Sequence, residues 1–159
     1  MQDKQPPGLG ELLRYVAELV EQGAEERYAQ LNLNYRARYT PVLRALNAGA
    51  ETITDITTRS HLTQGAISQS VSLMESDGLL SRYSLADGRK TGVRLTPAGR
   101  RLVERLEPHW AVTFRAIADL ESEIGYPLRR ALESTARALE RRSFAKRLAA
   151  IQPERAERA

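Results

Sequence analysis

One short part of the chain favours β-structure, and the sequence on both sides of it has the periodicity of helices. Residues 79–85 and 92–95 are β-compatible runs, and Asp87-Gly88 lies in the segment that joins them. Asp-Gly between two strand-like runs is a strong signal of a two-stranded hairpin. The sequence therefore predicts a mainly α-helical protein that carries one small β-hairpin, or wing, at residues 79–95.

Two short helices are predicted immediately before this hairpin. Thr52-x-x-Asp55 has the form of a capping box and begins the first helix, and Thr63 begins the second. Two short helices that are joined by a tight turn and followed by a basic-tipped hairpin form a winged helix-turn-helix. We expect residues 35–96 to make this module.

Longer helices are predicted on both sides of the module. Apolar residues recur every three or four positions across residues 9–34 and again across residues 97–151. A central module of this size is too small to cover the apolar stripes of such helices. We therefore expect both segments to be dimerisation helices that pack against a twofold-related second copy of the chain. Residues 1–8 are expected to form a flexible arm and residues 152–159 a frayed tail.

Two Thr-Pro pairs predict where helices begin. Thr40-Pro41 and Thr96-Pro97 each place a threonine at the N-cap and a proline at the first helical position. After Gly125-Tyr126-Pro127, a single last helix is expected to include both Leu128 and Leu148.

The charge of the chain is distributed unevenly. The sequence has 24 Lys and Arg against 20 Asp and Glu, a formal net charge of +4. Residues 1–34 carry a net −3, residues 35–101 a net +5 and residues 102–159 a net +2. The basic excess lies in the predicted module, which favours double-stranded DNA as its partner.

The second short helix of the module is expected to face base edges. Glutamine can pair bidentately with adenine, and serine can reach a base or a phosphate. Gly65 has no side chain, so the backbone could approach the duplex closely. The candidate DNA-binding residues of this helix are Thr63, Gln64, Gly65, Ser68, Gln69 and Ser72. An ordinary polar stripe that faces solvent is the alternative that the residues leave open.

The tip of the hairpin carries two further candidates. Arg89 and Lys90 project from the two-stranded ribbon, where an arginine can enter a narrow minor groove and contact phosphates. Asp87 is expected to bridge Arg89, Arg82 or Arg94 and so to brace the wing. A charged turn that serves only solubility is the alternative.

Aromatic residues gather near the predicted join of the module and the long helices. Their grouping favours packing in the core or the dimer interface, and an apolar pocket that they line for a small-molecule effector is the alternative. These residues are Tyr28, Tyr35, Tyr39, Trp110 and Phe114. Arg36 or Arg38, in the same region, is expected to contact phosphate, and binding of an acidic ligand there is the alternative.

Catalysis, cofactors and metals are not expected. The chain has no cysteine, which removes disulfides, zinc fingers and thiol chemistry. Its two histidines, His61 and His109, lie far apart and have no nearby carboxylate pair at ligand spacing. The longest apolar run, residues 148–151, is too short to cross a membrane. We expect a cytoplasmic protein with no membrane partner.

Three segments of the module resemble the MarR family of winged helix-turn-helix regulators. Residues 73–82, LMESDGLLSR, are similar to the end of that family's recognition helix and its first wing strand. Asp87-Gly88-Arg89 matches its Asp-x-Arg wing element, and residues 93–99, VRLTPAG, resemble its second wing strand and the following helix start. Ser60-His61 departs from the apolar residue and glycine that are usual in the family's turn.

The resemblance implies a homodimeric transcription factor, usually a repressor, often released by a small aromatic or anionic ligand. Together with the basic module, it predicts a sequence-specific DNA-binding regulator on a pseudo-palindromic operator. A winged-helix adaptor that binds a protein partner without reading DNA is the alternative.

Overall fold

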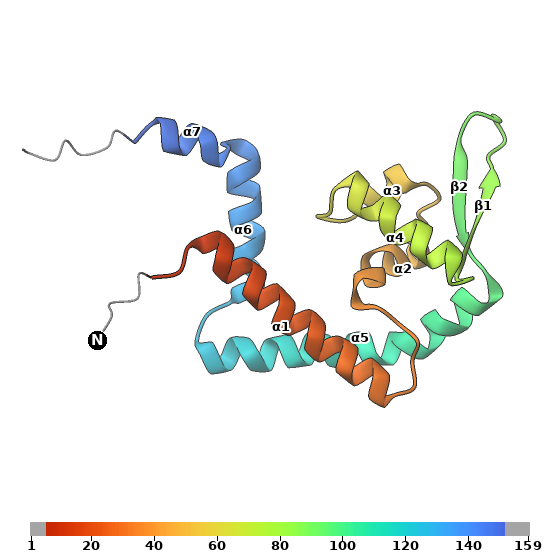
Figure 1. Cartoon of the computed structure of the whole chain (residues 1–159), viewed down its shortest axis with the longest axis horizontal. Coiled ribbons are helices and arrows are strands. Elements are labelled where there is room, and N and C mark those ends of the chain that lie inside the picture. Colours follow the sequence, from red (N-terminus) through yellow and green to blue (C-terminus); the bar gives the residue numbers. More distant parts are fainter. Residues whose placement is uncertain (1–5, 152–159) are drawn as a thin grey trace, which may run out of the picture. The chain divides into compact units, whose positions relative to one another are not determined.

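A computed structural model describes residues 6–151 of the chain (Figure 1). This part is mainly α-helical and contains a single two-stranded antiparallel sheet, which confirms the predicted fold class. The elements are α1 (Leu9–Gln30), the 3₁₀ helix η1 (Ala37–Tyr39), α2 (Thr40–Asn47), α3 (Ile53–Thr58), α4 (Gln64–Ser76), β1 (Leu80–Ser84), β2 (Thr91–Leu95), α5 (Pro97–Ile124), α6 (Leu128–Arg141) and α7 (Phe144–Ala149). The chain divides into two compact units between Pro108 and His109.

The first unit has a continuous apolar core. Ile67, Val71 and Met74 form one face of α4 because they recur at helical spacing, and all three are fully buried. The start of α5 adds Leu106, which is also fully buried. Other buried members of this core include Val42, Leu43, Ala45, Ala50, Ile56, Leu80, Val93, Leu102 and Val103. α2, α3, α4, the hairpin and the start of α5 thus share one core.

The hairpin is paired from Leu80↔Leu95 to Ser84↔Thr91 and follows directly from the C-terminal end of α4 (Figure 1). Gly88 at its turn has a φ of +64°, a conformation that glycine adopts readily. Tyr83 pairs with Gly92, and a Cβ at Gly92 would lie 2.3 Å from the tyrosine ring. Glycine at position 92 therefore leaves the space that the Tyr83 ring occupies beside β2.

Three of the predicted helix starts are confirmed and one is wrong. α5 begins at Pro97, and the Thr96 hydroxyl accepts a hydrogen bond from the backbone N–H of Gly99 at 3.1 Å. Thr52 and Asp55 form the expected reciprocal capping box, and the Thr63 hydroxyl accepts a hydrogen bond from the backbone N–H of Ala66. Thr40 is not an N-cap, because η1 runs directly into α2 and Tyr39 takes that position. The Thr40 hydroxyl instead forms a hydrogen bond with the hydroxyl of Tyr35.

The single helix predicted from Leu128 to Leu148 is interrupted. α6 ends at Arg141 and α7 begins at Phe144, after Ser143 accepts a hydrogen bond from the backbone N–H of Lys146. Arg147 compensates the break by donating to the carbonyl oxygens of Ala138 and Arg142, at 3.0 and 3.2 Å. The Ser143 hydroxyl and the Arg147 side chain therefore satisfy the N–H of Lys146 and the carbonyl of Arg142, which would pair with each other in a continuous helix.

α1 and the second unit leave large apolar side chains exposed. Leu12, Val16 and Leu19 share one face of α1 and are 41–52% exposed. Within residues 109–151 no side chain is buried. The apolar residues exposed there are Val112, Phe114, Leu120, Ile124, Tyr126, Leu132, Leu139, Phe144, Leu148 and Ile151. Within residues 6–151, no helix has both the length and the apolar composition of a membrane span.

Candidate nucleic-acid interface

The predicted DNA-reading residues lie along one polar side of α4. Gln64, Gly65, Gln69 and Ser72 are exposed, and Ser68 is half-buried. The first turn of α4 contains no acidic residue, so no carboxylate opposes the positive end of the helix dipole. This side of α4 offers hydrogen-bonding groups in a setting that accepts an anion such as a phosphate.

Thr63 differs from the other candidates because its side chain already has a structural task. Its hydroxyl oxygen lies 3.2 Å from the backbone nitrogen of Ala66 and caps the helix. A hydroxyl retains its own O–H donor when its oxygen accepts a bond. Thr63 can therefore position α4 and still donate to a phosphate.

Arg38 of η1 extends this polar side of α4. Its Nη2 donates to Oε1 of Gln69 at 2.9 Å, although 31 residues separate the two in the sequence. Both side chains are exposed. The sequence shows two arginines within residues 35–39, but no local pattern in it predicts that Arg38 contacts Gln69.

The wing tip is shaped by Asp87 through the backbone. Oδ1 of Asp87 accepts hydrogen bonds from the N–H groups of Arg89 and Lys90, each at 3.2 Å. The N–H of Leu85 donates to the carbonyl oxygen of Lys90 at 3.0 Å and closes the turn. The side chains of Arg89 and Lys90 are exposed. Asp87 thus fixes the turn and leaves two cations facing solvent at its tip.

The bridge predicted from Asp87 to an arginine is not among the ion pairs of residues 6–151. Nε of Arg82 lies 2.9 Å from Oε2 of Glu75, and its Nη2 lies 3.5 Å from the hydroxyl of Ser72. This ion pair joins β1 to α4. Arg82 therefore fixes β1 against α4, because its guanidinium pairs with Glu75 and not with Asp87 at the hairpin tip.

Arg94 braces the sheet itself. Its guanidinium carbon lies 5.1 Å from the ring centroid of Tyr83, within the range of a cation–π contact. Its Nε donates to the hydroxyl of Ser81 at 3.4 Å. Both contacts cross from β2 to β1.

Three of the five aromatic residues considered for a ligand pocket pack together in the first unit. The rings of Tyr28 and Tyr35 are 4.6 Å apart and those of Tyr35 and Tyr39 are 6.3 Å apart, both edge to face. All three are at most 6% exposed. The Tyr39 hydroxyl donates to Oδ2 of Asp77 at 2.8 Å, and burial raises the pKa of Tyr39 above 10.0. These tyrosines fill core space and connect η1 to the end of α4.

The other two aromatic residues belong to the second unit. Phe114 is 42% exposed, and the guanidinium carbon of Arg129 lies 5.9 Å from its ring centroid. Trp110 is half-buried, and its indole Nε1 is buried without a hydrogen-bond partner. A ligand pocket formed by all five residues stays a prediction.

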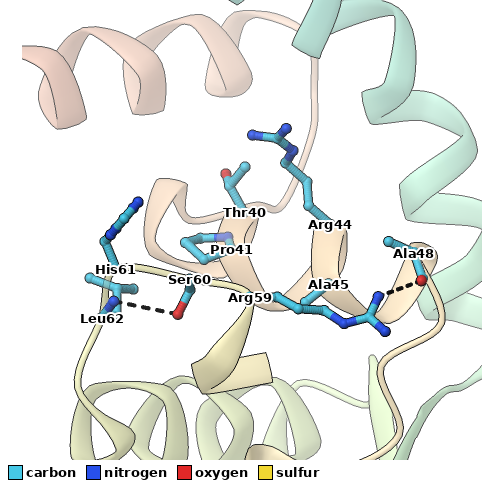
Figure 2. A pocket seen from close by; sticks show the side chains of 9 residues that line it. All are labelled: Thr40, Pro41, Arg44, Ala45, Ala48, Arg59, Ser60, His61 and Leu62. Atoms are coloured by element: carbon cyan, nitrogen blue, oxygen red, sulfur yellow. Dashed lines mark hydrogen bonds between the residues drawn. The ribbon is translucent and has the colours of Figure 1, made fainter. Parts of the chain in front are cut away.

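A groove of about 520 Å³ lies between α2 and the turn that follows α3 (Figure 2). Arg59 crosses its edge and donates from Nη1 to the carbonyl oxygen of Ala48 at 2.6 Å. His61 projects from the turn, and Arg44 projects from α2. The lining contains no acidic residue and consists of Thr40, Pro41, Arg44, Ala45, Ala48, Arg59, Ser60, His61 and Leu62. Among residues 6–151, no cluster of three metal-ligating side chains is present.

The sequence matches no family model and no curated protein. Solved structures, however, match the fold over most of the chain. The M. tuberculosis transcriptional regulator MOSR, crystallised with DNA, has a TM-score of 0.68 at 19% identity, over 84% of this chain and 97% of its own. A MarR family transcriptional regulator from Silicibacter pomeroyi DSS-3 has a TM-score of 0.59 at 25% identity, over 82% and 94%. The S. aureus MepR–DNA complex has a TM-score of 0.61 at 20% identity, over 81% and 99%. The chain has the MarR-like winged-helix fold.

Within the MarR-like fold of this chain, α3 and α4 are the helix-turn-helix and β1 with β2 is the wing. The resemblance predicted from residues 73–99 is therefore confirmed at the level of the fold. Ser60-His61, where the turn departs from the family pattern, lies at the edge of the groove beside α2.

Proposed function

We propose that the chain is a sequence-specific DNA-binding transcriptional regulator that acts as a homodimeric repressor. The observation that carries this proposal is the pairing of an exposed polar side of α4 with a wing tip that presents Arg89 and Lys90. The structures of MOSR and MepR, which share the fold, are complexes with DNA. The function therefore rests on chemistry in this chain and on a fold that two other proteins use with DNA.

We assign α4 and the wing to different grooves of the duplex. Gln64, Ser68, Gln69 and Ser72 would read or contact the major groove, since an α-helix fits that groove. The wing tip would enter the adjacent minor groove and contact its phosphates. Arg82 and Glu75 would hold the two elements at a fixed separation, because their ion pair joins β1 to α4.

The homodimer is proposed from the uncovered apolar residues. A monomer rarely leaves large contiguous apolar patches in water. The stripe of Leu12, Val16 and Leu19 on α1 and the uncovered residues of α6 and α7 would be covered by the same elements of a second copy. Two recognition helices would then meet successive major grooves about 34–36 Å apart on a pseudo-palindromic operator.

A binding titration tests the DNA proposal. Labelled DNA from upstream of the gene and an unrelated duplex of equal length would be titrated by fluorescence anisotropy at several salt concentrations. We expect tighter binding to the upstream DNA and a negative dependence of log affinity on log salt. Arg89→Ala should weaken binding to both duplexes and reduce the salt slope by about one phosphate contact.

Arg115→Ala in α5 is the matched control, because it removes the same charge from an exposed position in the second unit. This variant should bind as the wild type does. If the two duplexes bind equally and Arg89→Ala leaves the salt slope unchanged, DNA reading is wrong. The adaptor alternative would then stand, with the polar side of α4 facing a protein.

Release by a small aromatic or anionic ligand is part of the same proposal. The groove beside α2 has an apolar floor of Pro41, Ala45 and Leu62, while Arg44 and Arg59 supply cations. An aromatic carboxylate fits this combination, and a ligand there would contact the turn of the helix-turn-helix. We expect 4-hydroxybenzoate to raise the melting temperature of the wild type and to do so less for Arg59→Met. Equal shifts in both proteins would contradict this site.

A further inference from the structure

We infer that Arg38 determines which base Gln69 selects, by fixing the orientation of the Gln69 side-chain amide. This inference rests on the proposed function, because it concerns how α4 reads DNA. It assigns a positioning role to a residue outside the helix-turn-helix, in the short segment η1.

The chemistry of the two side chains allows only one orientation of the amide. A guanidinium group donates hydrogen bonds and accepts none. The atom of Gln69 that lies 2.9 Å from Nη2 of Arg38 must therefore be the carbonyl oxygen Oε1. The NH₂ group of Gln69 consequently faces away from Arg38.

The position of Arg38 is set by its neighbour in the sequence. Tyr39 is 1% exposed, and its hydroxyl donates to Asp77 at the C-terminal end of α4. Arg38 and Tyr39 thus contact α4 at two points eight residues apart, about 12 Å along the helix axis. A buried anchor on one side of Arg38 makes its contact with Gln69 part of the packing of η1 on α4.

This orientation changes the hydrogen bonds that Gln69 offers to a base. An unpaired glutamine presents one donor and one acceptor, which match the N6 amino group and N7 of adenine. The guanidinium occupies one lone pair of Oε1. Its positive charge beside this oxygen also repels the partly positive hydrogens of the adenine amino group, so Oε1 becomes a poorer acceptor for adenine. Gln69 and Arg38 together therefore present donors, and guanine offers two acceptors, N7 and O6, in the major groove.

The structure thus assigns guanine preference to the Arg38–Gln69 pair, where Gln69 alone would prefer adenine. Removing the guanidinium should free Oε1 and return the adenine preference. A phosphate-binding arginine would behave differently, because it would lower affinity for all sequences equally.

Selection from a randomised duplex library tests this inference without a known operator. Wild type, Arg38→Met, Gln69→Ala, the Arg38→Met/Gln69→Ala double variant and Arg115→Met would each be taken through the same rounds, and the bound DNA would be sequenced. Methionine keeps most of the length of the arginine side chain and removes its donors. Arg115→Met is the matched control, since it makes the same substitution at an exposed arginine of the second unit.

We expect the wild type and Arg115→Met to enrich guanine over adenine roughly tenfold at one position of each half-site. Arg38→Met should enrich adenine at that position, and Gln69→Ala should lose the preference. The double variant should behave as Gln69→Ala does, because Arg38 acts through Gln69.

Two results would overturn the inference while leaving the proposed function intact. One is an adenine preference in the wild type, and the other is an unchanged preference in Arg38→Met with uniformly weaker binding. Absence of any enriched sequence with the wild type would remove sequence-specific DNA binding itself, and this inference with it.

Discussion

The two units of the chain use the same helical periodicity with opposite results. In the first unit, Leu43, Ile56 and Leu106 come from three different helices and are all fully inaccessible to solvent. In the second unit, Leu132 and Leu139 occupy equivalent core-facing spacings on α6 but are 43% and 38% exposed. An amphipathic pattern therefore predicts a helix, but it does not predict that the apolar face of the helix is buried within the same chain.

The difference follows from how many elements converge. α2, α3, α4, the hairpin and the start of α5 present apolar faces to one another, so each stripe is buried by several neighbours. Helices in the second unit follow one another along the chain and bury no residue within 109–151. These elements of the first unit can thus be stable by themselves, whereas α1 and the second unit should gain stability from the proposed second copy.

The largest expected effect separates the two units directly. Leu106→Ala should lower the free energy of unfolding by about 2–5 kcal/mol, because it removes a fully buried side chain and leaves a cavity. Leu139→Ala removes the same atoms from a partly exposed site of the second unit, so it should lower the free energy of unfolding by less. Urea titrations followed by circular dichroism would measure both.

The effect of Leu139→Ala should depend on protein concentration, because Leu139 is proposed to lie in the dimer interface. Leu139→Ala should weaken the dimer, so light scattering should find monomer at a concentration where the wild type has twice the mass of one chain. A wild type that remains monomeric at micromolar concentration would contradict the proposed dimer. At high dilution, Leu139→Ala could instead lower the free energy of unfolding as much as Leu106→Ala does. That result would show that the second unit has a buried core of its own without a second copy.

A smaller effect is expected where α5 meets the start of the wing. A Cβ on Gly99 would lie 2.2 Å from the carbonyl oxygen of Leu79, so Gly99→Ala must displace backbone. We expect a loss of about 1–3 kcal/mol in the free energy of unfolding. Gly65→Ala is the matched control, because its nearest atom would be 4.0 Å away.

In an open helical position, alanine is favoured over glycine by about 1 kcal/mol. Gly65→Ala should therefore stabilise the fold slightly while weakening DNA binding, if the backbone of α4 approaches the duplex there. Denaturant titrations of both variants measure the contrast. Equal stability of Gly99→Ala and the wild type would mean that the close approach of α5 to Leu79 is not a constraint.

Features set by neighbouring residues could be predicted from the sequence. The hairpin, the capping box of Thr52 and Asp55 and the cap at Thr63 each depend on residues within a few positions. The break before Ser143 was missed although serine is a strong N-cap, because the apolar spacing continues across it.

Features set by packing could not be predicted. Thr40 looks like an N-cap, but the fold brings the Tyr35 hydroxyl to it. Gln69 looks like an adenine reader, but η1 brings Arg38 to its oxygen from 31 positions away. Such pairs depend on how η1 packs on α4, and no local pattern records that packing. The polar residues of the candidate interface could be named from the sequence, but their hydrogen-bond partners could not.

The smallest expected effect concerns the anchor that holds η1 to α4. Tyr39→Phe keeps the buried ring and removes the hydrogen bond to Asp77, whose own side chain is exposed. Water can then replace the lost donor, so we expect a loss of about 1 kcal/mol in the free energy of unfolding. The Arg38–Gln69 contact should loosen as well, because η1 loses its hydrogen bond to Asp77 and is held to α4 by the buried ring alone.

The pH dependence of folding stability should distinguish Tyr39→Phe from the wild type. Burial and the bond to Asp77 raise the pKa of Tyr39 above the 10.0 of a free tyrosine. Between these two pKa values the folded protein holds a proton that the unfolded chain has released, so folding stability falls as pH rises above about 10. The contribution is fully present below pH 10 and disappears above the folded pKa. The stability difference between the wild type and Tyr39→Phe should therefore be constant from pH 7 to 9 and shrink above pH 10. A difference that stays constant to higher pH would mean that the Tyr39–Asp77 bond does not anchor η1.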